Sequence, residues 1–259
     1  MIMEWILLFI AGVLGGVLNS VAGGGSFITF PTLLFVGVPP IIANATNTFA
    51  ACAGYLSGAY GFRQDIAKHP EAIAFTVFWS LVGGAVGAYL LLNISESMFL
   101  EAIPWLLLFA TLLFIFGEKV GDLATKIATG ASLSSRWSTL ALALCLMAVS
   151  AYGGFFNAGL GVIVLSYLVL AGYKDINQMN GLKLLVSSCV SLIAIVIFVS
   201  QGSIDWSRGL VVMLGTLLGG YVAARVSRQV KQQHVRRFVA LSSSVMTVYF
   251  FTDVYLLAG

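Results

Sequence analysis

The segment Asn19-Ser20-Val21-Ala22-Gly23-Gly24-Gly25-Ser26 interrupts an apolar region that runs from about residue 5 to residue 37. Consecutive glycines disfavour a helix, because each costs about 1 kcal/mol relative to alanine. The region is too long for one membrane span and short for two. We therefore expect non-helical backbone at membrane depth, which survives only where protein or a water-filled cavity satisfies its polar groups. The alternative is that these glycines serve close helix packing.

The composition around this segment is that of a membrane protein. Of the 259 residues, 59% are hydrophobic and 9% are charged, against about 25% charged in soluble domains. The mean hydropathy is +1.00, which excludes a soluble globular enzyme. Six further stretches are long enough, or nearly so, to cross a bilayer as helices: about 41–60, 71–92, 98–117, 179–200, 207–224 and 238–257. The predicted fold is an all-α integral membrane bundle.

A second interrupted region, about 137–172, indicates an internal repeat. We expect its break at Tyr152-Gly153-Gly154, with Asn157, Gly159 and Gly161 following. Gly15-Gly16-Val17-Leu18-Asn19 returns as Gly153-Gly154-Phe155-Phe156-Asn157, and Asn44-Ala45-Thr46-Asn47 matches Asn180-Gly181-Leu182-Lys183. We predict a first membrane repeat over residues 1–117, a polar cytoplasmic linker over 118–136 and a second membrane repeat over 137–259. The isolated glycines favour close helix packing instead of breaks; they are Gly83, Gly87, Gly215 and Gly219.

The basic residues predict that the two halves are inverted. Eleven of the 13 Lys and Arg residues lie in loops that alternate consistently onto one side of the membrane. By the positive-inside rule this side is cytoplasmic. The loop near 61–70 is then inside, whereas its counterpart near 201–206 is outside. We predict two inverted five-segment repeats, with both termini outside and with the first two segments of each repeat short, as re-entrant hairpins or short crossings.

Inverted repeats with broken helices at matching positions are typical of alternating-access transporters, whose substrates bind near the midplane. Helix amino termini at such breaks suit an anion. Lys183 is the one basic residue set well inside an apolar span, where a lysine costs about 2.5–3.5 kcal/mol. No acidic residue occurs at comparable depth. Lys183 therefore either binds a transported anion or extends its amine to the cytoplasmic surface.

The other candidate ligands are neutral hydrogen-bond donors. Asn19 and Asn157 lie beside the two breaks, and Asn47 is the counterpart of Lys183. Each amide either donates to an anion or caps the freed backbone of its own break. Serine and threonine are weaker candidates, because in membranes they usually bond to their own helix. The predicted substrate site comprises Asn19, Gly23, Gly24, Gly25, Ser26, Thr46, Asn47, Asn157 and Lys183.

Motifs for other activities are missing from the sequence. It has no Walker A, H-E-x-x-H, C-x-x-C or G-x-S-x-G pattern, so we predict neither an enzyme nor a bound cofactor. The cysteines lie in apolar stretches without metal-type spacing, as packing residues do. The net charge of +3 is too small to suggest nucleic acid as a partner.

The chain resembles the TauE/SafE family over nearly its whole length. The resemblance rests on these segments: Ala11 to Gly16, Asn19, Ala22 to Ser26, Pro31 to Leu34, Ala43 to Asn47, Gly153-Gly154, and Asn180 to Lys183. It implies a multi-pass permease of the bacterial inner membrane for small sulfur-containing anions, such as sulfite, sulfoacetate or related sulfonates, with export the expected direction. The second half departs from an unbroken glycine run and has Ala158-Gly159-Leu160-Gly161. The shape of its break is therefore open.

Without an ATPase motif, energy would come from the anion's own electrochemical gradient or from coupled protons. Under a negative-inside potential, exit of an anion is downhill. The expected partners are the substrate anion and the lipid bilayer, and a homo-oligomer is left open. Two alternatives from other classes are an anion-selective channel and a non-transporting membrane interaction protein.

Overall fold

The structure is a computed structural model that describes residues 2–21, 23–68, 70–130, 135–226 and 232–257. Within these ranges it is helical apart from short connections, and it contains no strand. The predicted all-α membrane fold is confirmed. The side chains of most basic residues in the central linker and near 225–237 lie outside the described part of the chain.

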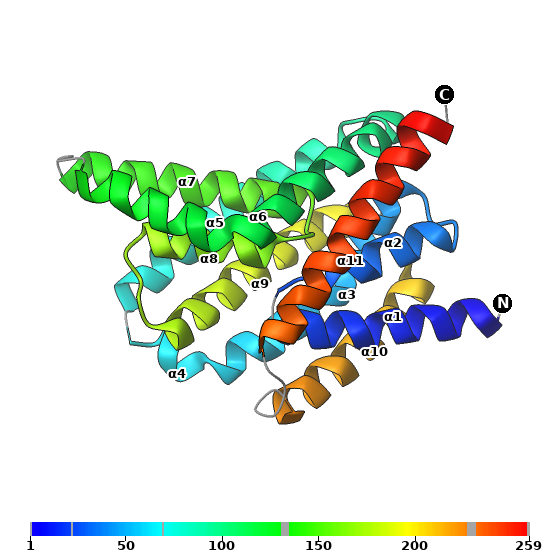
Figure 1. Cartoon of the computed structure of the whole chain (residues 1–259), viewed down its shortest axis with the longest axis horizontal. Coiled ribbons are helices and arrows are strands. Elements are labelled where there is room, and N and C mark those ends of the chain that lie inside the picture. Colours follow the sequence, from blue (N-terminus) through cyan, green and yellow to red (C-terminus); the bar gives the residue numbers. More distant parts are fainter. Residues whose placement is uncertain (1, 22, 69, 131–134, 227–231, 258–259) are drawn as a thin grey trace.

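Two series of helices follow one another along the chain (Figure 1). The first series is α1 (Ile2–Val21), α2 (Ser26–Phe35), α3 (Pro40–Gly61), the single turn α4 (Arg63–Ile66), α5 (Pro70–Leu92) and α6 (Glu96–Gly130). The second series is α7 (Ser135–Phe155), α8 (Leu160–Leu170), α9 (Ile176–Ser200), α10 (Trp206–Val226) and α11 (Gln232–Thr252), followed by the π-helical turn η1 (Asp253–Leu257). Because α6 continues to Gly130, it crosses the expected domain boundary after residue 117; the division into domains stays a prediction.

The lengths of the helices correct one prediction. The second helix of each half is short, with 10 residues in α2 and 11 in α8. The first is not, because α1 has 20 residues and α7 has 21. Six helices of the described chain are long and apolar enough to cross a membrane, within α1, α5, α6, α9, α10 and α11. The predicted span 41–60 lies in α3, which is not among the six, because its Asn, Thr, Ser and Gly residues lower its hydropathy.

Both predicted breaks exist, but the second begins later than expected. The first follows α1, where Gly23 has a φ of 79°, a left-handed conformation that glycine adopts without strain. The second separates α7 from α8, and Gly159 there also has a φ of 79°. Gly153 and Gly154 are helical, because they serve packing: a Cβ added to Gly154 would lie 2.2 Å from the carbonyl oxygen of Gly84.

Glycines bring the outer helices together in two pairs. A Cβ added to Gly219 of α10 would lie 2.0 Å from the Val13 oxygen of α1, and one added to Gly87 of α5 would lie 1.9 Å from the Ala151 oxygen of α7. The packing interpretation of the isolated glycines is therefore confirmed, since no larger residue fits these contacts.

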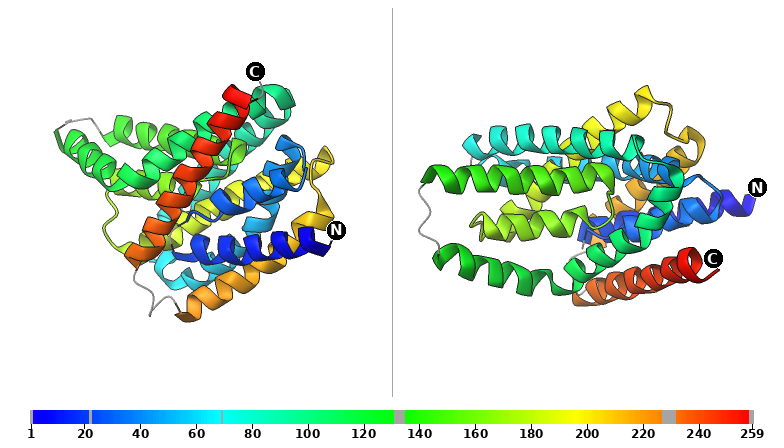
Figure 2. Two further views of the ribbon diagram at one scale, coloured as in Figure 1. Left: turned by 45° about the vertical axis from the view of Figure 1, so that its right-hand side comes forward. Right: turned by 90° about the horizontal axis from the view of Figure 1, so that it is seen from above.

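The main helix contacts of the first series resemble those of the second, although α4 has no matching helix among the described residues of the second series (Figures 1 and 2). α3 and α9 pack together at the centre. α1 packs along α10 on one side of them, and its counterpart α7 packs along α5 on the other. α6 covers α8, α11 contacts α2, and α6 and α11 contact each other. Both termini lie at the end of the bundle opposite α4 (Figure 2).

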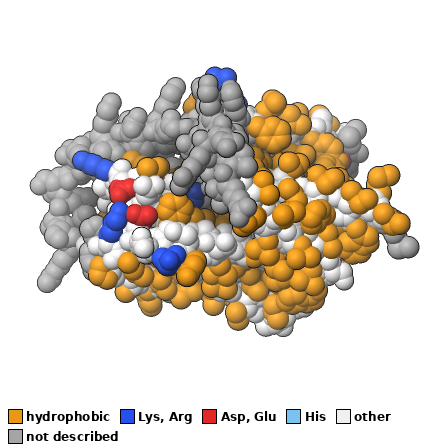
Figure 3. Space-filling model, turned by 90° about the horizontal axis from the view of Figure 1, so that it is seen from below, with side chains coloured by type: hydrophobic (Ala, Val, Ile, Leu, Met, Phe, Trp, Pro, Cys, Tyr) orange, Lys and Arg blue, Asp and Glu red, His pale blue; other side chains and the backbone are white. Residues whose placement is uncertain are grey.

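The surface agrees with immersion in lipid. On the face shown in Figure 3, hydrophobic side chains cover most of the described surface, and the charged side chains gather mainly at one end. Large apolar residues are exposed on helices of both series, for example Leu90 of α5, Val196 of α9 and Leu241 of α11. Such a continuous apolar surface is typical of contact with a membrane. The chain is a multi-pass membrane protein.

Candidate substrate site

The two helix breaks meet near the centre of the bundle. A Cβ added to Gly161, at the start of α8, would lie 3.5 Å from the Cα atom of Gly23 in the first break. The same Cβ would lie 3.5 Å from the Cδ atom of Lys183 on α9. The first break, the start of α8 and the predicted lysine are therefore mutual neighbours.

Lys183 is buried without a counter-charge. Its residue is 4% exposed, and its Nζ atom donates a hydrogen bond of 3.2 Å to Oδ1 of Asn180, one turn earlier on α9. No acidic side chain among the described residues pairs with it. Its amine is held inside the bundle and not at the protein surface.

Asn157 links the second break to both central helices. Its Oδ1 atom accepts a hydrogen bond of 2.8 Å from the Tyr55 hydroxyl on α3. Its Nδ2 atom donates one of 3.4 Å to Oγ of Ser191 on α9. The Tyr55 hydroxyl also lies near the side chains of Ser26 and Asn19, so this tyrosine joins polar groups from both breaks.

Asn19 caps its own break. Its Oδ1 atom accepts a hydrogen bond of 2.8 Å from the N–H of Gly25, the residue before α2. Gly25 packs against α1, since an added Cβ would lie 2.1 Å from the Gly15 oxygen. Gly24 faces Val239 of α11 instead. Of the three predicted glycines, Gly23 is the one that faces the other break.

Four buried side-chain atoms of the first half have no hydrogen-bond partner among the described residues, and two of them belong to the predicted site. Asn47 is 1% exposed, and Thr29 donates a hydrogen bond to its Oδ1 atom, which leaves its Nδ2 atom unpaired. Ser26 is 2% exposed, and its Oγ atom is unpaired. Native proteins contain few buried unpaired polar groups. Both atoms are therefore candidates to bind a ligand.

Thr46 lies apart from these groups. Its Oγ1 atom accepts a hydrogen bond of 2.9 Å from the N–H of Asp205, in the loop before α10. The reason is helix geometry, because one residue along α3 turns the side chain by about 100° away from the direction of Asn47. Two other buried hydroxyl groups, those of Thr48 and Ser188, bond to carbonyl oxygens one turn earlier on their own helices.

The sequence reasoning missed Tyr55 and Ser191. Tyr55 lies two turns after Asn47 on α3, and Ser191 lies two turns after Lys183 on α9. Residues eight apart share a helix face, so this spacing, applied to both repeats, could have found the pair. The described residues hold no cluster of three or more His, Cys, Asp or Glu side chains suited to a metal.

Comparison with known families decides the class of this protein. The family model described as "Sulfite exporter TauE/SafE" matches residues 8–250. The chain belongs to the TauE/SafE family. It is thus a membrane transporter by family, in agreement with its multi-pass fold.

Curated relatives match this TauE/SafE transporter along nearly their whole length. A "Probable membrane transporter protein" of Haemophilus influenzae is 31% identical over 243 residues, which cover 93% of this chain and 92% of the relative. "Probable membrane transporter protein YfcA" of Escherichia coli strain K12 is 26% identical and covers 95% of this chain and 89% of the relative. "Probable membrane transporter protein ORF9" of a Sinorhizobium species is also 26% identical, with 95% and 92% covered. No solved structure matches.

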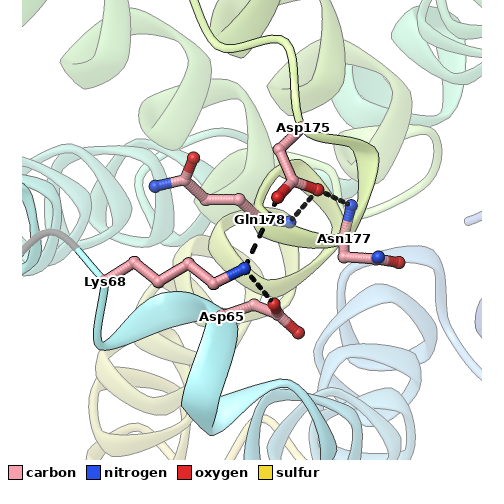
Figure 4. Close-up of polar contacts among 5 residues, drawn as sticks. All are labelled: Asp65, Lys68, Asp175, Asn177 and Gln178. Carbon is pink, nitrogen blue, oxygen red and sulfur yellow. Dashed lines mark hydrogen bonds and ion pairs between the residues drawn. The ribbon is translucent and has the colours of Figure 1, made fainter.

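Polar contacts join α4 to the start of α9 at one end of the transporter (Figure 4). Nζ of Lys68 lies 2.7 Å from Oδ1 of Asp65 and 3.5 Å from Oδ2 of Asp175. Asp175 caps α9 by accepting hydrogen bonds from the N–H groups of Asn177 and Gln178, which lower the pKa of its carboxyl group. The hydrogen bond to Asp65 raises the pKa of Lys68.

The short turn α4 packs directly on this end of α9. A Cβ added to Gly181 would lie 2.8 Å from Cγ1 of Ile66 and 3.1 Å from Cβ of Phe62. Gly181 precedes Lys183 by two residues, so α4 packs close to the part of α9 that carries the candidate lysine.

Different contacts join helices at the opposite end. Arg208 at the start of α10 forms ion pairs of 2.8 Å with both Glu4 of α1 and Asp205. Oε2 of Glu96, at the start of α6, accepts a hydrogen bond of 3.1 Å from the N–H of Ile41 on α3. The candidate site thus lies between two ends that are held by independent sets of contacts.

Proposed function

We propose that this transporter exports small sulfur-containing anions, such as sulfite or organosulfonates, across the bacterial inner membrane by alternating access. The observation that carries the proposal is Lys183, a buried lysine with no acidic partner among the described residues. A buried charge without a counter-charge is strongly unfavourable. A bound anion would supply the missing charge.

Other polar groups of the predicted site suit an oxyanion. Asn47 Nδ2 and the Ser26 hydroxyl are buried and unpaired, and both can donate hydrogen bonds to anionic oxygens. The amino terminus of α8 begins at the point where the breaks meet, and helix amino termini favour negative charge. These groups add affinity without a second buried charge.

An inverted repeat would provide the two access states. The exchange of α1 to α6 for α7 to α11 preserves the pattern of helix contacts, and the positive φ angles of Gly23 and Gly37 return at Gly159 and Gly172. Thr111 of α6 and Thr247 of α11, which occupy matching helices, hydrogen-bond to each other at 3.2 Å. This pattern supports a two-fold axis through the candidate site, the arrangement in which one repeat rocks against the other.

The membrane potential would suffice to drive export. Moving one negative charge out of a negative-inside cell releases about 2.3 kcal/mol per 100 mV. Coupled protons are the alternative energy source, and measurement of flux with and without a pH gradient separates the two.

The test is a flux assay in proteoliposomes with sulfite, sulfoacetate and taurine. The wild type should transport at least one of these compounds with saturation, and Lys183→Ala and Lys183→Met should lose that flux. Lys174→Met is the matched control, because Lys174 is exposed in the loop before α9, and it should keep the flux. Unchanged anion flux in both Lys183 variants would remove this residue from the site.

Counterflow distinguishes a carrier from an anion channel. A carrier exchanges labelled anion faster when unlabelled anion is present on the other side, and its rate saturates. A conductance that rises linearly with concentration would contradict alternating access. A protein that neither transports these anions nor gains thermal stability from them would instead be a membrane interaction protein.

A further inference from the structure

The described residues supply no fixed counter-charge for Lys183. The helices that pack against α9 are α3, α4, α5, α7 and α8. Asp65 of α4 and Asp175 before α9 are the acidic side chains described in this region, and Lys68 pairs with both at the exposed end of the bundle. Arg63 of α4 is exposed. The other titratable side chains that lie buried or half-buried on these helices are thiols and phenols, which ordinarily carry no charge at neutral pH: Cys52, Tyr55, Cys145, Tyr152, Tyr167 and Cys189.

The groups in contact with the lysine side chain are neutral. Its Nζ atom donates a hydrogen bond of 3.2 Å to Oδ1 of Asn180, and Gly161 lies beside its stem. An ammonium group and a neutral amine can both donate this bond, and an amide oxygen does not neutralise a charge. A buried charge without a partner is strongly unfavourable, and a lysine avoids it by releasing its proton, which an arginine does not. We therefore expect Lys183 to be charged while an anion lies beside it and neutral otherwise.

We propose that Lys183 carries a proton through the transport cycle, protonated while an anion is bound and neutral while the empty protein returns. Water on the inner side supplies this proton together with the anion, and water on the outer side receives it. The inference rests on the proposed function and adds a proton to its cargo. A dianion such as sulfoacetate then moves one net negative charge outward in each cycle and is driven by the membrane potential, whereas a monoanion moves none.

Sulfoacetate is the probe for proton movement, because neither of its acid groups titrates near neutral pH. Wild-type proteoliposomes enclose sulfoacetate, weak buffer and a pH dye. Valinomycin with equal K⁺ on both sides holds the membrane potential at zero, so that charge movement does not drive a proton leak. The lumen should lose one proton for each sulfoacetate that leaves and should become alkaline.

Two other outcomes of this measurement have different meanings. Sulfoacetate efflux without a change of lumen pH would overturn the inference and leave the proposed function intact. Transport of none of sulfite, sulfoacetate and taurine would contradict the proposed function, and the inference with it.

Lys183→Arg separates the two steps of the cycle. Exchange of labelled for unlabelled sulfite uses only the loaded protein, in which the guanidinium group faces an anion. Net efflux also requires the empty protein to return, and in that step arginine keeps a buried charge without a partner. Whatever the change in affinity, net sulfite efflux should therefore fall at least about tenfold further than exchange.

Lys174→Arg is the matched control, since Lys174 is exposed in the loop before α9. Its ratio of net efflux to exchange should equal that of the wild type. The wild-type ratio in a Lys183→Arg protein would also overturn the inference. If the Lys183→Arg protein does not fold or does not bind sulfite, the proton count of the wild type still decides whether a proton accompanies the anion.

Discussion

At the scale of single residues, the contacts of Asn157 explain how one amide can serve both halves of the molecule. Its two side-chain atoms bond to Tyr55 on α3 and Ser191 on α9, which the predicted repeat places at matching positions. Both bonds hold the amide in one orientation beside the first turn of α8. We therefore assign Tyr55 the role of a positioning residue for Asn157.

Tyr55→Phe should raise the substrate concentration for half-maximal flux several-fold while the maximal rate changes little. The loss of the hydroxyl frees Oδ1 of Asn157, and it should lower the free energy of unfolding by about 1 kcal/mol, as for other buried hydrogen bonds. Concentration series of sulfite flux in proteoliposomes measure both parameters.

The control for Tyr55→Phe is Thr216→Val, which removes the 2.8 Å hydrogen bond from Thr216 to the Ala50 oxygen between α10 and α3. Thr216→Val should lower the free energy of unfolding by a similar amount and leave the substrate concentration for half-maximal flux unchanged. If the substrate concentration for half-maximal flux rose equally in both variants, the effect of Tyr55 would be explained by protein stability alone.

Sequence reasoning at this scale identified the residues whose chemistry is unusual for a membrane interior. Lys183 and the three asparagines stand out, because each carries a polar group that lipid cannot satisfy. It grouped Thr46 with Asn47 because they are adjacent in sequence, whereas the helix turns them apart. It missed Tyr55, whose ring is ordinary in a membrane and whose importance depends on a partner 102 residues away.

At the scale of elements, glycines have two different roles, and a sequence does not separate them without knowledge of the neighbours. Gly23 and Gly159 adopt positive φ angles at the breaks. Gly153 and Gly154 form an equally conspicuous pair, yet they are helical and serve contacts with Leu160 and Gly84. The second break was therefore predicted too early in the sequence. The residues that explain the helical state of Gly153 and Gly154 lie on α5 and α8, outside the local sequence pattern.

Gly87→Ala should destabilise the transporter by about 1–3 kcal/mol, as overpacking does. Its new methyl group would lie 1.9 Å from the Ala151 oxygen and would push α5 away from α7. Thermal unfolding in detergent measures the effect.

Gly54→Ala is the matched control, because Gly54 also lies in a helix but has no neighbouring atom within 4 Å of an added Cβ. It should be neutral or stabilise the protein by up to about 1 kcal/mol. The same melting temperature for both variants would argue against close α5–α7 packing.

At the scale of the whole molecule, composition and hydropathy sufficed to predict an all-α membrane bundle, because a chain with 9% charged residues has few ways to cover a soluble surface. The contact pattern between the two series of helices could not be predicted in this way. This pattern depends on which helices meet through their glycine-containing faces, and hydrophobic periodicity alone does not specify which helices pair. The orientation of the halves stays a prediction from the placement of basic residues.

Cysteine labelling tests that orientation. In a variant without Cys52, Cys145 and Cys189, Gln201→Cys should react with a membrane-impermeant maleimide in intact cells. Lys68→Cys should react after permeabilisation only. Both positions are exposed and lie in matching loops of the two halves.

Asn93→Cys serves as the reference for the labelling, because it lies in the loop after α5, on the side predicted to be outside. It should react as Gln201→Cys does. Labelling of positions 68 and 201 from the same side would contradict an inverted repeat and favour a parallel one.

The most direct test of the central claim is equilibrium binding of labelled sulfite to the purified protein, wild type against Lys183→Met. Methionine keeps the apolar stem of the side chain and removes its charge. If Lys183 is the counter-charge of the transported anion, the dissociation constant should rise by at least about 30-fold, with the melting temperature of the empty protein unchanged or higher. An unchanged dissociation constant in a folded Lys183→Met protein would contradict the account.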